Sequence, residues 1–159
     1  MASRMTVIVI ELVVLAFWLG AAVLFSAVVA PAAFAVLPTR ALAGDIVGRV
    51  LPVIFYAGIA VGLVTIALAR AEAEEWQWST AVVSGALIVA TCAVAQFIIG
   101  SRIELVRSRI SGPVDALAPG DPLRLEFGRL HGVSVALLGV AMLAAAAALV
   151  AITRNLARR

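Results

Sequence analysis

Four long runs of apolar residues constrain this chain more than any other feature of its sequence. They lie at about residues 5–29, 42–69, 80–100 and 130–152. A helix needs about 20 predominantly apolar residues to cross the hydrocarbon core of a bilayer, and each run reaches that length. In lipid, only helices and closed barrels satisfy every backbone polar group. We therefore expect each run to form a membrane-spanning helix.

The composition indicates that lipid is the solvent for much of the chain. Hydrophobic residues make up 64% of the 159 residues and charged residues only 13%, whereas soluble domains carry about 25% charged residues. The net charge of +3 is explained by arginines near the ends of the runs, so we predict the lipid bilayer, and no nucleic acid, as partner. All twelve basic residues are arginine, a bias typical of a GC-rich bacterium. We therefore predict a multi-pass protein of the bacterial inner membrane.

The first run begins like a signal peptide, because Arg4 precedes it and small residues follow near Ala27. It is longer than the apolar part of a typical signal peptide and contains Glu11. We predict that it is retained as a span, which Pro31 then bends or ends.

The segment 101–129 predicts a helical hairpin outside the membrane. Ile103, Val106 and Ile110 recur at helical spacing, so the third helix should continue past Gly100. Gly112-Pro113 should end it, and Asp121-Pro122 is typical of an N-cap followed by the first helical position. The predicted fold is one all-α domain over 1–159, a four-helix up-down bundle whose third and fourth helices extend beyond the bilayer on one side.

Two features leave alternatives open. Glycine pairs at Gly44/Gly48, Gly58/Gly62 and Gly128/Gly132 allow close helix approach, either inside the bundle or at a homodimer or docking face. Seven arginines fall on one side of the expected bundle and five on the other, which does not determine the membrane orientation.

In an up-down bundle, the ends of the first and third runs and the starts of the second and fourth share one membrane face. The candidate polar cluster on that face comprises His131, Arg129, Arg102, Ser134, Asp45, Arg49 and Gln96. Asp45 and Arg49 have the i,i+4 spacing of a helical ion pair, which is either structural or a site for a head group or a partner loop. His131 is the only histidine; it either hydrogen-bonds to Asp45, Gln96 or a carbonyl, or contacts a ligand or metal.

Glu11 lies toward the opposite side of the expected bundle. It either extends outward to pair with Arg70 or Arg154, or forms a functional intramembrane acid. Cys92 and Met142 fall near mid-span, where soft sulfur ligands favour Cu(I), but two such residues are better explained by packing.

Two groups of residues carry a family resemblance. The first comprises Trp18-Leu19-Gly20, Pro31, Phe34, Leu37-Pro38, Ala43-Gly44 and Gly48. The second is the run Phe127-Gly128-Arg129-Leu130-His131-Gly132-Val133-Ser134. Together with Arg102, they resemble the transmembrane protein 205-like family (DUF4149) over nearly the whole chain. The resemblance implies a four-helix membrane protein without an established reaction. It also implies a shared polar cluster of Arg102, Arg129, His131 and Ser134.

The chain departs from the family pattern at two positions. Leu138 stands where relatives often carry an asparagine, and Glu11 stands roughly where many carry a histidine. A site that used the asparagine amide is altered or absent here.

The sequence contains no nucleophile–base arrangement, phosphate-binding loop or HExxH motif, so we predict no catalytic residues and no enzymatic activity. We expect a structural or accessory subunit, or a binding module, of a larger membrane complex. One alternative is a small transport or metal-tolerance protein that forms a path as a homo-oligomer. Another is a membrane haem or redox protein that uses His131. No cofactor is expected otherwise.

Overall fold

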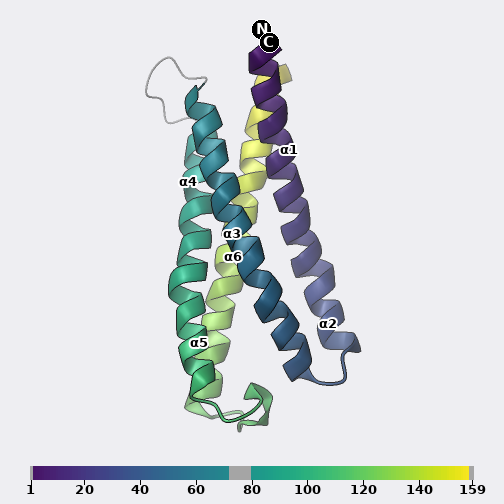
Figure 1. Ribbon diagram of the computed structural model, residues 1–159, viewed down its shortest axis with the longest axis vertical. Coiled ribbons are helices and arrows are strands. Elements are labelled where there is room, and N and C mark those ends of the chain that lie inside the picture. The colour runs from purple at the N-terminus through teal and green to yellow at the C-terminus, as the bar shows by residue number, and fades with distance from the viewer. Residues whose placement is uncertain (1, 72–79, 158–159) are drawn as a thin grey trace.

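The computed structural model describes residues 2–71 and 80–157 of the chain as four long helices that alternate in direction (Figure 1). The first comprises α1 (Ala2–Leu24), a π-helical stretch η1 (Phe25–Val29) and α2 (Ala30–Val36). The second is α3 (Arg40–Ala71). The described residues contain no strand. The predicted all-α architecture of four long apolar helices is therefore confirmed.

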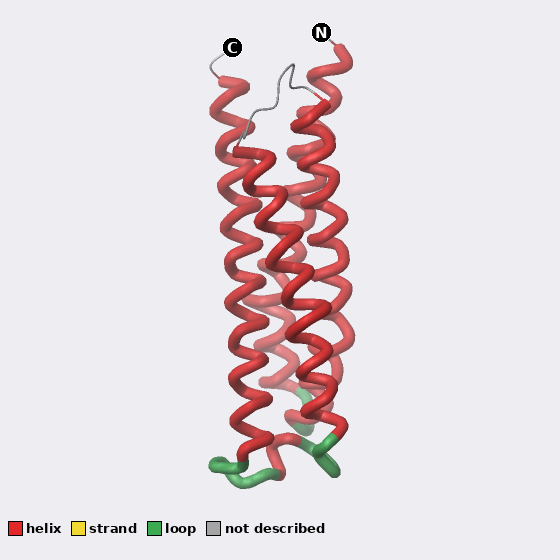
Figure 2. The backbone as a smooth tube through the Cα atoms, turned by 90° about the vertical axis from the view of Figure 1, so that its left-hand side faces the viewer, coloured by secondary structure: helices red, strands yellow, loops and turns green. Residues whose placement is uncertain are grey.

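The second half of the chain repeats this pattern of one interrupted and one continuous helix. The third helix comprises α4 (Thr80–Ala93), a π-helical stretch η2 (Val94–Gly100) and α5 (Ser101–Ser108). After a short 3-10 helix η3 (Val114–Ala116), α6 (Pro122–Ala157) forms the fourth helix. The links 37–39 and 109–121 lie at the same end of the bundle (Figure 2). We call it the cavity end, because a cavity opens there.

The first helix continues through Pro31, where the sequence predicted a bend or an end. Proline has no N–H to donate, and its ring crowds the carbonyl one turn back. The backbone accommodates the proline with a π turn directly before it, in which the Ala30 N–H donates to the Phe25 carbonyl five residues back. The helix ends only at Val36, before Pro38.

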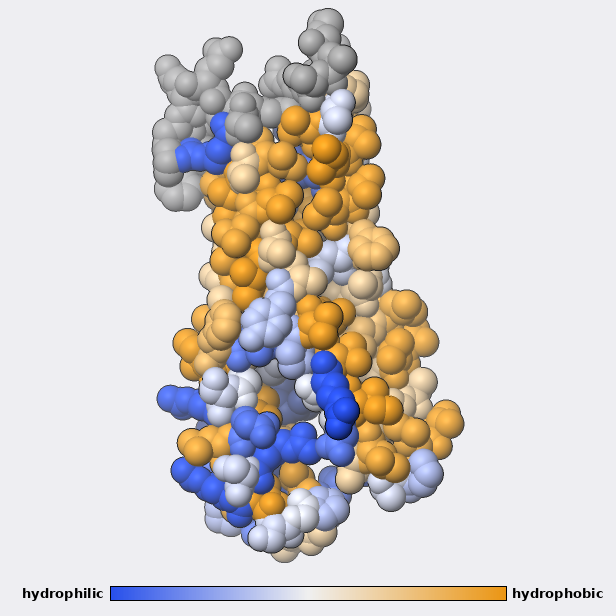
Figure 3. Space-filling model, in the orientation of Figure 1, coloured by the Kyte–Doolittle hydropathy of each residue, from blue (hydrophilic) through white to orange (hydrophobic). Residues whose placement is uncertain are grey.

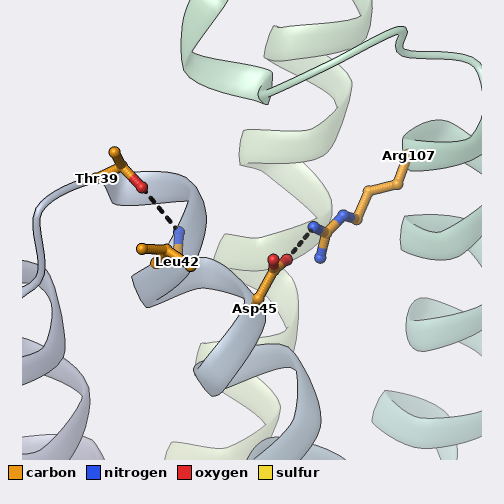
Figure 4. Close-up of polar contacts among 4 residues, drawn as sticks. All are labelled: Thr39, Leu42, Asp45 and Arg107. Atoms are coloured by element: carbon orange, nitrogen blue, oxygen red, sulfur yellow. Dashed lines mark hydrogen bonds and ion pairs between the residues drawn. The ribbon is translucent and has the colours of Figure 1, made fainter.

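Side chains cap both helices that begin at the cavity end. The Thr39 hydroxyl accepts a hydrogen bond from the Leu42 N–H at 3.3 Å (Figure 4). Asp121 Oδ1 accepts from the Leu123 N–H at 2.8 Å, and Pro122 is the first residue of α6. The predicted start of the fourth helix is thus confirmed, as is the continuation of the third helix by two turns beyond Gly100.

Away from the cavity end, the helices are in close contact. A Cβ atom added at Gly62 would lie 2.8 Å from the Gly85 carbonyl, so α3 and α4 touch backbone to backbone. One added at Gly58 would lie 2.6 Å from Cys92 Sγ and 2.8 Å from Trp18 Cζ2. The Trp18 indole also donates to the Ile54 carbonyl at 3.0 Å. We call these residues the packed region: Trp18, Gly58, Gly62, Gly85 and Cys92.

The outer surface of the bundle is apolar. Phe17 is 80% exposed and Leu143 is 72% exposed, and hydrophobic residues cover much of the face seen in Figure 3. Such a surface is unfavourable in water and suits lipid. All four helices are long and apolar enough to cross a membrane: Met5–Val36, Arg40–Arg70, Thr80–Ser108 and Pro122–Ala157.

Candidate functional site

A cavity of about 1030 Å³ opens at the cavity end, where α3 diverges from the third helix (Figure 1). Its walls come from the first half of α3, from η2 and α5, and from the first turns of α6. The link 109–121 contributes part of the lining. Figure 3 shows hydrophilic residues gathered around this hollow.

An ion pair bridges the two diverging helices. Arg107 Nη2 on α5 donates to Asp45 Oδ1 on α3 at 2.7 Å (Figure 4). The sequence spacing had suggested Arg49 as the partner of Asp45, but the structure joins Asp45 to an arginine on a different helix. The side chains are 38% and 52% exposed. Ion pairs this exposed are typically worth about 0–1 kcal/mol, so the bridge is easily exchanged for another partner.

A second polar contact joins the same helices closer to the packed region. Gln96 Nε2 donates to the Tyr56 hydroxyl at 3.4 Å, which is a long and therefore weak hydrogen bond. The Tyr56 ring also meets Phe97 edge to face, with ring centroids 5.9 Å apart. These contacts mark the point where α3 and the third helix come together again.

The lining of the cavity changes character with depth. Near the packed region the wall is apolar and includes Phe55 and Ala95, both of which are buried. Nearer the cavity end the lining is charged. The charged lining residues are Arg40, Asp45, Arg49, Glu104, Arg107, Asp115 and Arg124. The cavity therefore presents an apolar interior and a charged rim.

His131 and Ser134 reach the cavity from α6. The His131 ring stacks parallel to Phe127, with centroids 6.3 Å apart. No hydrogen bond joins His131 to another residue within 2–71 and 80–157, so the predicted alternative of a bond to Asp45, Gln96 or a carbonyl finds no support there, and the alternative of a ligand contact stays a prediction. Ser134 is 2% exposed and lies deeper in the bundle. His131 therefore offers the cavity an aromatic edge whose nitrogens remain available to a ligand.

Arg124 fastens the link between the third and fourth helices. Its Nη1 donates to the Leu117 carbonyl at 2.6 Å and to the Asp115 carbonyl at 3.5 Å. The sequence analysis did not select this residue, because a contact to a backbone carbonyl across a loop leaves no pattern in the sequence. Arg124 shapes the rim of the cavity by holding the loop beside α6.

The structure brings together most, but not all, of the candidate polar cluster. The members that line the cavity are His131, Ser134, Asp45, Arg49 and Gln96. Arg102 and Arg129 are exposed and lie outside the lining. A regular α-helix would turn Arg102 about 240° from Gln96, but the π-helical stretch η2 contains Gln96 and changes this rotation. The sequence periodicity therefore did not select Arg107 in place of Arg102.

Glu11 points into the bundle. It is 6% exposed and lies between the buried Ile8 and Leu15 on α1, at the end opposite to the cavity. Burial places Glu11 inside the bundle, and both predicted roles, pairing with Arg70 or Arg154 and a functional intramembrane acid, stay predictions. Ionisable groups within spans usually face the bundle interior, and Glu11 follows that rule. It does not contribute to the cavity.

Cys92 packs against Gly58 in the packed region and is fully buried. Across residues 2–71 and 80–157, no group of three His, Cys, Asp or Glu side chains is placed to hold a metal ion.

Four apolar helices with a polar-rimmed cavity at one end define a multi-pass helical membrane protein. A family model described as a domain of unknown function (DUF4149) matches residues 13–110, and the chain belongs to this family. Comparison with curated proteins and with solved structures gives no match. The matched region contains the cavity walls on α3, η2 and α5. The wall on α6, with His131 and Ser134, lies outside it.

Proposed function

We propose that this protein is a non-enzymatic binding module of the membrane, serving as an accessory subunit of a larger membrane complex. The observation that carries the proposal is the cavity of about 1030 Å³ between α3, the third helix and α6. Small-molecule sites are concave and mostly apolar, with a few placed polar groups, and typically enclose about 300–1,000 Å³. An apolar interior with a charged rim matches that description.

The arrangement of the two regions favours holding a ligand over passing one across the membrane. None of the lining residues belongs to the packed region. Beyond them, Trp18 and Cys92 fill the space around Gly58, and α3 and α4 touch at Gly62 and Gly85. A path across the membrane would have to separate these backbones.

We also propose a family subgroup and a cellular location for the chain. The run Phe127–Ser134 supports a transmembrane protein 205-like member of the family. The absence of lysine and the richness in alanine support a bacterial inner-membrane protein. In the native membrane we expect it to associate with a larger complex, and blue-native electrophoresis tests this. Migration as a defined homo-oligomer alone would contradict the accessory role and favour transport.

Filling the cavity tests the binding role directly. A Cβ at Gly128, which lines the cavity, meets nothing within 4 Å. Gly128→Leu should therefore occupy the cavity without disturbing the fold. We expect native mass spectrometry of the gently solubilised protein to detect a bound molecule that is lost in Gly128→Leu.

The matched control is Gly20→Leu, which also meets nothing within 4 Å but lies on the exposed surface of α1. It should retain the bound molecule. Equal retention in both variants, or no bound molecule in the wild-type protein, would refute the binding role.

A further inference from the structure

Two polar contacts frame the gap between α3 and the third helix. Asp45 pairs with Arg107 at one end of the gap, and Tyr56 contacts Gln96 at the other. The two contacts are 11 residues apart on each helix. On α3 this is three α-helical turns, so Asp45 and Tyr56 share the side that faces the third helix. The frame is therefore about 16 Å long along α3.

Small residues form the edges of this frame. Gly48 on α3 and Gly100 at the end of η2 both line the cavity. A Cβ added at Gly48 would meet only Arg107 Nη1, at 3.6 Å, and one at Gly100 would meet only the carbonyl of its own helix at Ala95, at 3.4 Å. Neither glycine touches the backbone of the facing helix. Figure 3 looks into this gap, which connects the cavity sideways with the lipid-facing surface.

The frame lies across the expected boundary between hydrocarbon and head groups. Residues 50–69 of α3 and 80–101 of the third helix carry no charge, and about 20 residues span the hydrocarbon core. Tyr56 then lies about 9 Å inside that core, and Asp45 lies about 7 Å outside it. A molecule in the gap would meet lipid-like surroundings at one end and head-group surroundings at the other.

The charged rim favours an anion. The charged lining comprises four arginines and three acids: Arg40, Arg49, Arg107 and Arg124 with Asp45, Glu104 and Asp115. Within residues 2–71 and 80–157, Arg40 and Arg49 have no hydrogen-bond or ion-pair partner. Arg107 already holds a carboxylate oxygen at 2.7 Å, the contact that a phosphate oxygen would make with a guanidinium.

We propose that the gap is a lateral window through which the cavity takes an anionic phospholipid from the bilayer. Its phosphate lies at Arg49 and Arg107, where it either shares Arg107 with the Asp45 carboxylate or displaces that carboxylate. An acyl chain lies along Leu51 and Phe55. The inference rests on the proposed binding function and adds the class of ligand and its route.

The test measures lipid binding to the full chain in detergent by native mass spectrometry. We expect phosphatidylglycerol to bind at least about tenfold more tightly than phosphatidylcholine, because both phosphates accept the same hydrogen bonds but the rim arginines repel the choline cation. Arg107→Gln and Arg49→Gln should each remove most of this preference. Arg102→Gln, on the same helix as Arg107 but outside the lining, should leave it unchanged.

Two further arms separate the route and the source of the anion. Gly48→Leu should narrow the window and reduce phosphatidylglycerol occupancy several-fold, whereas Gly20→Leu should not. Inorganic phosphate and glycerol 3-phosphate should not displace the lipid at millimolar concentration, because neither carries an acyl chain. Displacement by either would replace the proposal with a site for a free anion.

The outcomes distinguish failure of the phospholipid proposal from failure of the binding function. Equal binding of both lipids, or a preference that survives Arg49→Gln and Arg107→Gln, overturns the anionic phospholipid but leaves a binding module. If Gly128→Leu retains every molecule that the wild-type protein binds, the binding function itself is overturned.

Discussion

The same two helices meet in opposite ways along their length. In the packed region, a Cβ at Gly62 of α3 would collide with the Gly85 carbonyl of α4 at 2.8 Å. At the cavity end, a Cβ at Gly44 of α3 would meet nothing within 4 Å, and one at Gly48 would meet only an arginine tip. Two glycine pairs with identical spacing on α3 therefore have different roles. Gly58 and Gly62 permit helix contact, whereas Gly44 and Gly48 leave space.

This difference gives a direct reason for placing function at one end. Membrane helices associate through close packing of small residues, because lipid supplies no hydrophobic drive between them. Contacts at Gly58 and Gly62 can hold the bundle together in the packed region, so α3 and the third helix are free to separate at the cavity end. The charged lining and the ion pair lie where the helices separate.

The largest expected effect comes from exchanging glycine for leucine in the two regions of α3. Gly62→Leu should destabilise the protein by about 3 kcal/mol, because backbone atoms block the new side chain and cannot move aside. Gly44→Leu should change stability by less than about 0.5 kcal/mol. Thermal unfolding in detergent, followed by circular dichroism, measures both. Similar losses of stability in the two variants would remove the contrast.

An intermediate effect is expected for the aromatic stack on α6. His131→Ala removes the ring that stacks on Phe127 and should cost about 1 kcal/mol of stability. If the cavity binds a ligand, occupancy in native mass spectrometry should fall more than stability does. Arg129→Ala, two residues away and exposed, is the matched control and should change neither. A parallel loss of stability and binding in His131→Ala would assign the ring a structural role alone.

The smallest effect on stability should come from the ion pair across the window. Asp45→Asn should destabilise the protein by at most about 1 kcal/mol, because both partners of the pair are substantially exposed. That loss should shrink further as salt screens the charges. Melting temperatures in low and high salt measure this dependence. A salt-independent loss well above 1 kcal/mol would show that the pair is a main support of the bundle and not an exchangeable bridge.

Local signals in the sequence predicted several elements correctly. Asp121 and Pro122 marked the start of the fourth helix, because capping depends on a few neighbouring residues. The apolar spacing after Gly100 correctly extended the third helix. Pro31 does not end the first helix, which was one of its two predicted effects, because a π turn five residues long accommodates it within the helix.

Contacts between helices were predicted less well. Arg49 and Arg107 are both arginines on the polar faces of helices, and nothing local indicates which of them reaches Asp45. The choice depends on how α3 and α5 are rotated and spaced relative to each other, and the π-helical stretch η2 changes that rotation just before α5. Arg102 was selected from the sequence for its place after the third run, although its phase on the helix turns it away.

The number, length and apolar character of the helices were determined by the sequence itself, because each segment must satisfy its own backbone and match the lipid around it. The sequence also assigned the polar residues to one end of the bundle. Only the tertiary structure decided which glycines hold helices together and which line a cavity. That choice depends on the distance to a neighbouring helix, which is set by the packing of all four helices and not by any one of them.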